Sequence, residues 1–222
     1  MKQKSIAIKI IAITLKLLAI VLSFKKHKIA GFKVKTKPNV FPPRFTISNE
    51  VFYDFLSKVK RSFNLGVDIG CGSGILSLIL ASKCKHVIAT DISLSAVKVS
   101  YENAKLNNIL DKICIIACDV ASALKNNVAD IVVANPPFFK GRARTSIEQA
   151  IFHNREFIRK LASDTWRILK TGGLLYITLS TLGSYREYIR ELIRRGFKVR
   201  LKRVRRGFYG EIIMLVEAEK VS

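Results

Sequence analysis

The chain has 222 residues, 49% of them hydrophobic, which is enough to bury the core of one folded domain. It carries 39 lysines and arginines against 16 acidic residues, a formal net charge of +23. This charge favours polyanionic partners, RNA above all, with an acidic membrane surface as the competing partner. Heat adaptation alone does not explain it, because thermophilic proteins usually gain glutamate together with lysine.

Residues 5–24 are almost wholly apolar and have basic residues on both flanks. The length could span a bilayer, but Lys9 and Lys16 near its middle would be costly there. These lysines lie seven residues apart, on nearly one helical face, so we predict an amphipathic helix. It would lie on a membrane or pack on the rest of the protein, and spanning is the less favoured alternative. A cleaved secretory signal is disfavoured because lysines interrupt the apolar region.

Residues 29–37 alternate enough to predict one short strand before a Pro-Asn turn. We place a domain boundary there, with an N-terminal helix and basic connector over residues 1–37 and the main domain over residues 38–222. Apolar residues at helical spacing then predict a helix over residues 47–59, with Thr46 or Ser48 as its N-cap.

The apolar, strand-like run 65–69 is followed directly by Gly70, Gly72 and Gly74 and then by a helical pattern from Ile75. Glycines let the backbone bend sharply and approach a ligand, whose polar groups can meet free N–H groups at the helix start. Dinucleotide-binding domains also have such a turn, so the turn alone does not identify the ligand.

Three further strand-like runs, 86–90, 112–118 and 129–134, end next to Asp91, Asp119 and Asn135. Asp91 lies about 20 residues beyond the glycines, where a carboxylate can accept both hydroxyls of a ribose. A helical pattern over residues 94–106 alternates with these runs, which predicts βαβ units and a parallel sheet. The polar residues should then meet at the carboxyl edge of the sheet, where open parallel sheets bind ligands.

The ordered stretches V-D-I-G-C-G-S-G (67–74), D-I-S (91–93), C-D-V (118–120) and N-P-P-F (135–138) resemble the motifs of Rossmann-like S-adenosylmethionine-dependent methyltransferases. N-P-P-F is typical of the subgroup that methylates planar nitrogens. The resemblance covers residues 40–218 and implies an α/β fold with a mostly parallel seven-stranded sheet, helices on both faces and a C-terminal antiparallel hairpin.

The resemblance also implies S-adenosylmethionine as cofactor and assigns residues to it. The glycine turn, with Asp68, Gly70, Cys71, Gly72 and Gly74, would surround its methionine part. Asp91 would bind the ribose, Asp119 the adenine amino group, Ile92 and Val120 the adenine faces, and Asn135 would also contact the cofactor.

The N-P-P-F stretch suits transfer to an amino group conjugated to a ring or carbonyl, which is a poor nucleophile because its lone pair is delocalised. The Asn135 oxygen and the Pro136 carbonyl can accept hydrogen bonds from the two N–H groups of such an amine, which favours a pyramidal nitrogen. Pro136 and Pro137 make the backbone rigid, and Phe138 can stack on a flat substrate. No general base is needed, because the methylated nitrogen loses its proton readily. The alternative is an ordinary Asn-Pro turn with Phe138 in the core.

Several cations lie near the substrate side. Lys140, Arg142 and Arg144 follow the N-P-P-F stretch and could meet phosphates, although a solvated loop explains them nearly as well. Arg44 and Thr46 lie in a segment that loosely resembles one covering the active site of release-factor glutamine methyltransferases. They are further candidate substrate-binding residues, with a structural cap as the alternative for Thr46.

The carboxyl-terminal half predicts a helix over residues 148–169, a strand over 174–179, a helix over 185–194 and strands over 198–204 and 211–218. The last two strands should form an antiparallel hairpin. Alternation places Lys198, Arg200 and Lys202 on one face of it, beside Phe208 and Tyr209, which suits a nucleic-acid backbone and its bases.

The four cysteines, at 71, 84, 114 and 118, lack the spacing of a zinc site, so we predict no metal and reduced, buried thiols. No cysteine follows the N-P-P-F stretch, which removes the nucleophile expected of carbon-5 pyrimidine methyltransferases.

The sequence therefore predicts N-methylation of a base in structured RNA, ribosomal or transfer RNA, by a cytoplasmic enzyme. Methylation of a release-factor glutamine is the first alternative, although that family usually has N-P-P-Y. A methyltransferase attached peripherally to a membrane, with an unknown substrate, is the second.

Overall fold

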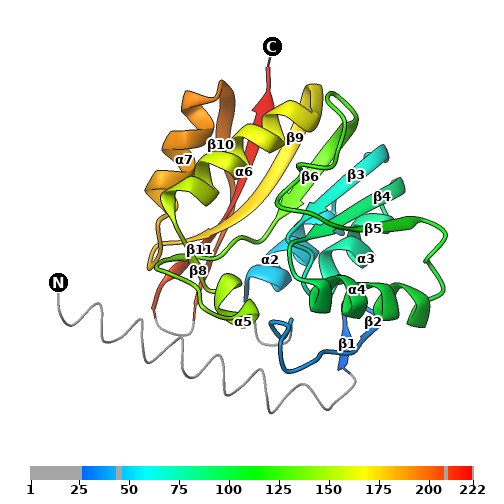
Figure 1. Ribbon diagram of the computed structural model, residues 1–222. Coiled ribbons are helices and arrows are strands. Elements are labelled where there is room, and N and C mark those ends of the chain that lie inside the picture. The colour runs from blue at the N-terminus through cyan, green and yellow to red at the C-terminus, as the bar shows by residue number, and fades with distance from the viewer. Residues whose placement is uncertain (1–26, 44–46, 208–209, 222) are drawn as a thin grey trace.

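A seven-stranded sheet forms the centre of the computed structural model, which describes residues 27–43, 47–207 and 210–221 (Figure 1). The strand order is β10-β11-β9-β6-β3-β4-β5. Its parallel part comprises β3 (Phe63–Ile69), β4 (Cys84–Asp91), β5 (Ile113–Ala117), β6 (Ala129–Ala134) and β9 (Leu169–Ser180). The hairpin of β10 (Phe197–Arg206) and β11 (Ile212–Lys220) adds to β9 in antiparallel fashion. The predicted fold class is confirmed.

Helices cover both faces of the sheet. On one face lie α2 (Ile47–Leu56), α3 (Ile75–Ala81) and α4 (Leu94–Leu106), and on the other lie α6 (Arg155–Ile168) and α7 (Tyr185–Arg194) (Figure 1). Successive side chains of β6 alternate between the two cores: Ile131 and Val133 pack in the first, and Val132 and Ala134 in the second. Strands buried on both faces explain the continuous apolar runs in the sequence.

The single helix predicted over residues 148–169 is wrong. The chain instead forms α5 (Ser146–Gln149), a short strand β8 (Phe152–His153) that pairs with β7 (Phe139–Lys140), and then α6. The Asn154 side chain caps α6 by accepting a hydrogen bond of 2.8 Å from the Phe157 N–H. The N-cap at Asn154 therefore sets the start of α6, although the helical spacing of apolar residues in the sequence continues upstream of it.

The one strand predicted over residues 29–37 is also wrong. It is a hairpin of β1 (His27–Ile29) and β2 (Phe32–Val34), turned by Ala30 and Gly31, which both have positive φ. Asn107, the C-cap of α4, and Asn103 within α4 accept hydrogen bonds from the backbone N–H groups of Lys33 and Lys35, at 2.9 and 2.8 Å. The strand β2 and the residue that follows it are thereby docked on the end of α4.

Several predictions concern residues outside the described ranges: the helix over residues 5–24, Arg44 and Thr46, and Phe208 and Tyr209. The division into domains at residue 37 stays a prediction. Among the helices in the described ranges, none combines the length and the apolarity needed to cross a membrane.

Candidate active site

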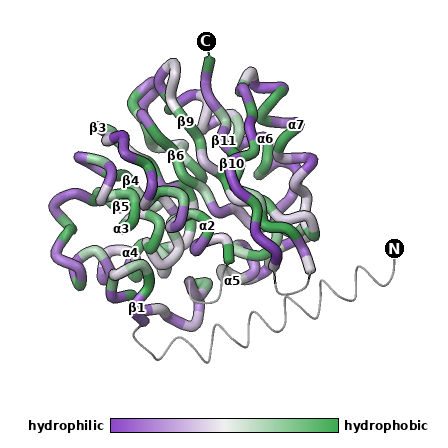
Figure 2. Tube along the Cα trace, turned by 180° about the vertical axis from the view of Figure 1, so that it is seen from behind, coloured by the Kyte–Doolittle hydropathy of each residue, from purple (hydrophilic) through white to green (hydrophobic). Residues whose placement is uncertain are grey.

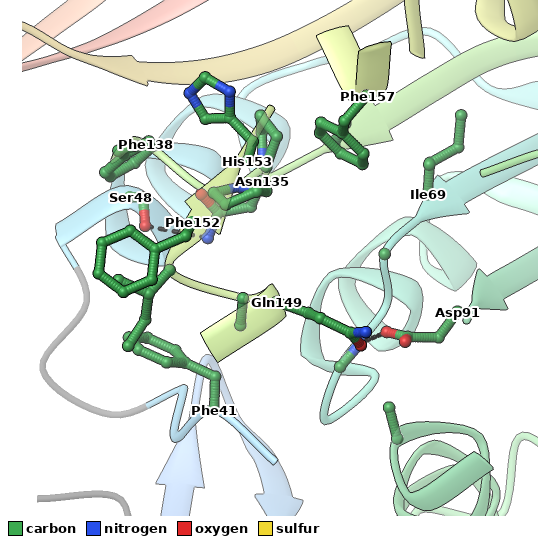
Figure 3. Close-up of a pocket in the computed structure, with 18 of the residues that line it drawn as sticks. Phe41, Ser48, Ile69, Asp91, Asn135, Phe138, Gln149, Phe152, His153 and Phe157 are labelled. Atoms are coloured by element: carbon green, nitrogen blue, oxygen red, sulfur yellow. Dashed lines mark hydrogen bonds between the residues drawn. The ribbon is translucent and has the colours of Figure 1, made fainter. Parts of the chain in front are cut away.

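A cavity of about 690 Å³ opens where the parallel strands end (Figure 3). Its wall contains residues from all four predicted motifs, namely Gly70, Cys71, Gly72, Asp91, Ile92, Asp119, Val120, Asn135, Pro136, Pro137 and Phe138. They meet because β3, β4 and β6 are parallel neighbours, with β5 beyond β4, so the carboxyl ends lie along one edge of the sheet.

The glycine turn after β3 presents bare backbone to the cavity. The N–H groups of Gly70 and Cys71 donate to the Thr90 carbonyl at 2.8 and 2.9 Å, which fixes the turn against β4. Gly70 and Gly72 have φ of 74° and 54°, and a Cβ on either would meet no atom within 4 Å. The turn therefore leaves room for a ligand to approach the backbone.

Gly74 and Asp68 lie behind this wall rather than in it. A Cβ on Gly74 would come within 3.1 Å of the Ser100 Cα, so this glycine allows the turn to pack on α4. The Asp68 carboxylate is fully buried and accepts a hydrogen bond of 2.5 Å from the Ser77 hydroxyl. Burial, with the charge of Asp91 as a smaller cause, raises the pKa of Asp68 to about 7. Both residues therefore support the conformation of the turn without lining the cavity.

Asp91 connects the glycine turn to α4. Its two carboxylate oxygens accept hydrogen bonds from the N–H groups of Gly72 and Ser93, each at 2.9 Å. Burial raises its pKa. Each carboxylate oxygen has a further lone pair, so Asp91 can still accept hydrogen bonds from two ligand hydroxyls.

The turn after β5 is held in a strained conformation. Val120 has φ of 56°, which is unusual for a β-branched residue. Its carbonyl accepts a hydrogen bond of 2.7 Å from the Thr90 hydroxyl, and the next N–H, of Ala121, donates to Asp164 of α6 at 3.2 Å. These contacts keep Asp119 exposed on the cavity wall.

The wall fits S-adenosylmethionine. Carboxylates at Asp91 and Asp119 can accept hydrogen bonds from ribose hydroxyls and an adenine amino group, and the turn at Gly70 and Gly72 has no side chain to obstruct the methionine part. Ile92, whose side chain is 58% exposed, offers an apolar face for the adenine ring.

Asn135 is held by three residues from two other elements. Its amide nitrogen donates to Ser48 Oγ at 3.0 Å and to Asn49 Oδ1 at 3.3 Å, both in α2. Its amide oxygen accepts a hydrogen bond of 2.6 Å from the Thr178 hydroxyl of β9. The donors of the amide are thus used internally, and its oxygen keeps one lone pair for a substrate N–H. Figure 3 shows Asn135 beside Ser48, with Asp91 across the cavity.

The rest of the N-P-P-F loop is fixed from the start of α7. The Tyr188 hydroxyl donates to the Pro137 carbonyl at 2.9 Å, and the Ser184 N–H donates to the Phe138 carbonyl at 3.0 Å. Tyr188 is buried, and burial raises its pKa, so its hydroxyl stays a hydrogen-bond donor. Gly183 lies against Phe138 so closely that a Cβ there would be 2.8 Å from the Phe138 carbonyl carbon.

An aromatic wall completes the substrate side. Phe41, Phe138 and Phe152 are half-buried and pack with Phe139 and Ile151 (Figure 3). His153 and Phe157 also line the cavity, and burial lowers the pKa of His153. Sequence reasoning missed Phe41, Phe152, His153 and Phe157 because their region was predicted as loop or helix core. The Asn154 N-cap was the signal that could have separated Phe152 and His153 from α6.

The predicted cations behave differently from one another. Arg142 lines the cavity, whereas Lys140 and Arg144 are exposed outside it. On β10, Arg200 lies 3.3 and 3.1 Å from carboxylate oxygens of Glu217 and Glu219, and Lys202 lies 3.4 Å from Glu217. Because these acids offset the charge, the predicted basic stripe on β10 is a weaker phosphate site than the sequence suggested.

The cysteines are free thiols, and their exposure differs from the prediction. Cys71 and Cys84 are buried, but Cys114 is exposed because β5 is an edge strand. Over the described ranges, no three His, Cys, Asp or Glu side chains gather in a way that could hold a metal ion.

A model of the methyltransferase small domain family matches residues 31–205. A candidate protein N5-glutamine methyltransferase of Methanocaldococcus jannaschii is 30% identical over 182 residues, which cover 78% of this chain and 89% of that protein. Ribosomal RNA small subunit methyltransferase C of Salmonella typhi is 28% identical over 198 residues, covering 88% of this chain and about half, 53%, of the relative.

Solved structures of methyltransferases share the fold. The 16S rRNA N2 methyltransferase of T. thermophilus, solved with S-adenosylmethionine and guanosine, has a TM-score of 0.63 at 22% identity, covering 88% of this chain and 50% of that one. The Mtq2–Trm112 complex of E. cuniculi has a TM-score of 0.60 at 20% identity, covering 82% and 99%. With the family model matching most of its length, this chain belongs to the methyltransferase small domain family and is a Rossmann-like, S-adenosylmethionine-dependent methyltransferase.

Proposed function

We propose that the chain methylates a conjugated amino nitrogen held against Asn135. The observation that carries this proposal is the fixed Asn135 amide, which shares one cavity with the glycine turn and Asp91. When bound, S-adenosylmethionine supplies an electrophilic methyl group. The Asn135 oxygen and the Pro136 carbonyl oxygen accept hydrogen bonds from the two N–H groups of the substrate nitrogen, which turns its lone pair toward the methyl.

Preorganisation is what the protein contributes to this step. Because Ser48 and Thr178 fix the Asn135 amide before substrate enters, little reorganisation is needed as positive charge develops on the nitrogen. The buried Tyr188 hydroxyl and the two prolines hold the Pro136 and Pro137 backbone in the same way. The extra proton of the methylated nitrogen can leave to water, so no side chain is assigned as a base.

We propose a base of structured RNA as the substrate and the cytoplasm as the location. The net charge of +23 and Arg142 at the cavity favour a polyanion. The wall of Phe41, Phe138 and Phe152 can stack on a flat ring, which a glutamine amide does not offer. The name of the Salmonella typhi relative also points to ribosomal RNA.

A release-factor glutamine is the second candidate. The Methanocaldococcus jannaschii relative, which the chain covers over 89% of its length, supports it, as does the fold shared with the E. cuniculi complex responsible for methylating a translation termination factor. Phe138 stands where release-factor methyltransferases usually have tyrosine.

The test uses the full-length protein and methyl-labelled S-adenosylmethionine. Total RNA and ribosome-free protein extract from the source organism are incubated separately, then digested and analysed for labelled nucleosides and amino acids. A labelled base amine supports the proposal, and N-methylglutamine would replace it with the second candidate. Label on a carbon or on ribose would overturn amino-nitrogen transfer, with Asn135→Ala as the inactive control in every arm.

A further inference from the structure

The outer face of α7 carries a row of three arginines. Arg186, Arg190 and Arg194 recur every four residues and are exposed, while Tyr188 and Leu192 of the same helix are buried. At a rise of about 1.5 Å per residue, neighbours in the row are about 6 Å apart along the helix axis and the row is about 12 Å long. We call these three residues the α7 row.

Acidic partners are scarce along the α7 row. Arg194 is 3.8 Å from Glu191, and Arg186 donates to the Tyr185 hydroxyl at 2.9 Å. Within the described ranges, no carboxylate lies within 4 Å of a guanidinium nitrogen of Arg186 or Arg190. Like charges four residues apart destabilise a helix by a few tenths of a kcal/mol per pair. An external anion would offset this repulsion.

A depression of about 360 Å³ runs along the same face. It is lined by the α7 row together with Ile189 and Ile193, and Ile193 is 57% exposed. Guanidinium groups bind phosphate oxygens in bidentate fashion, and the isoleucines offer an apolar surface to a sugar or base. The combination fits a nucleic-acid strand better than it fits isolated inorganic anions.

The position of α7 connects this row to the active site. The loop before α7 includes Leu182, which lines the cavity, and Ser184, whose N–H binds the Phe138 carbonyl. Arg186 follows within one turn, so the row begins near the substrate side and leads away along the helix. Figure 1 shows α7 at the β10 end of the molecule, and Figure 2 shows hydrophilic residues along the adjoining β10.

We propose that the α7 row binds the phosphate backbone of an RNA strand whose target base occupies the cavity. This inference rests on the proposed RNA substrate. A stacked strand carries one charge per about 3.4 Å, so a row of about 12 Å can meet one phosphate with each arginine. A narrow row that begins four residues after the cavity-lining Leu182 favours such a linear polyanion over a lipid surface, which would contact a broad plane of cations.

The test compares two triple variants of the full-length protein. Arg186→Gln/Arg190→Gln/Arg194→Gln removes the α7 row, and Lys85→Gln/Lys105→Gln/Lys112→Gln removes equal charge from exposed lysines near the opposite edge of the sheet. The affinity for a mixed-sequence, single-stranded 30-nucleotide RNA is measured by fluorescence anisotropy from 50 to 200 mM salt. Each phosphate contact contributes about 0.7 to the steepness with which log affinity falls against log salt. Loss of three contacts should therefore make this dependence shallower by about two in the arginine variant, whereas the lysine variant should keep the steepness of the unmodified protein.

Equal loss in both variants, or none in the first, would overturn the proposal. Circular dichroism and the affinity for S-adenosylmethionine should match the unmodified protein in both variants. Flotation with anionic phospholipid vesicles is run in parallel. If the arginine variant no longer binds vesicles but keeps the normal salt dependence of RNA affinity, the α7 row would be assigned to a membrane instead.

An assay of methyl transfer to RNA, made with the unmodified enzyme and with the arginine variant, tells failure of this inference apart from failure of the proposed function. If RNA is labelled and the α7 variant keeps the normal KM and salt slope, the inference fails while the function stands. If no RNA is labelled by the unmodified enzyme, the function fails, and the slope comparison still decides whether the α7 row binds RNA.

Discussion

Asp68 links the stability of the protein to pH through the turn beneath the cofactor site. Its carboxyl is fully buried, and burial raises its pKa from about 3.9 in an unfolded chain to about 7. Between these values the folded state holds a proton that the unfolded state has released. The contribution of Asp68 to the free energy of unfolding should therefore be largest below pH 4, fall as the pH rises through 7, and vanish above it. Three pKa units correspond to about 4 kcal/mol.

Asp68→Asn removes this titration. Between pH 4.5 and 7.5 the unmodified protein should lose about 3 kcal/mol of unfolding free energy relative to Asp68→Asn, because the variant has no carboxyl to titrate at this position. Urea unfolding followed by circular dichroism measures it. Asp130→Asn is the matched control, because hydrogen bonds from Lys170 and the Leu65 backbone lower the Asp130 pKa and confine its effect to acid pH. A difference for Asp68→Asn that stays constant over this range would refute the reasoning.

Three substitutions test the roles assigned in the cavity. Asn135→Ala should lower kcat for methyl transfer by about 100-fold or more while calorimetry finds an almost unchanged affinity for S-adenosylmethionine. Asp91→Ala should weaken that affinity by about 10- to 100-fold in the same calorimetric assay, because a charged acceptor of ribose hydroxyls is lost. Thr178→Val should lower kcat by about 10-fold with little change in KM, because the Asn135 oxygen loses its donor.

Each of these expectations has a distinct contradicting result. Full transfer by Asn135→Ala would remove the assigned mechanism, and an unchanged cofactor affinity in Asp91→Ala would remove its ribose role. Thr178→Ser keeps the hydroxyl and should restore kcat. If it does not, the effect of Thr178→Val reflects packing in β9 rather than positioning of Asn135.

The motif order was enough to predict the sheet and most of the cavity wall. Each signal is local: an apolar run, a glycine turn and a polar residue at the strand end lie within a few residues of one another. Because parallel strands align their carboxyl ends, Gly72, Asp91 and Asn135 were predicted to meet from sequence spacing alone. The family resemblance added the cofactor, which the glycine turn by itself does not identify.

Contacts between distant residues could not be predicted in this way. Asn135 is held by Ser48, 87 residues away, and by Thr178, 43 residues away. Periodicity also did not reveal that Phe152 belongs to the substrate wall, because an apolar residue has the same pattern in a helix core and in a cavity lining.

The sequence by itself thus determined which residues stand at the strand ends, since hydrophobic patterning and turn chemistry act over short distances. Only the tertiary structure decided which of the many cations have partners. On β10, Arg200 reaches Glu217 and Glu219, whereas on α7 Arg190 faces outward beside a shallow depression. The reason is physical: a charge is offset by whatever lies within a few ångströms of it, and that neighbourhood is created by the pairing of strands and the packing of helices rather than by position along the chain.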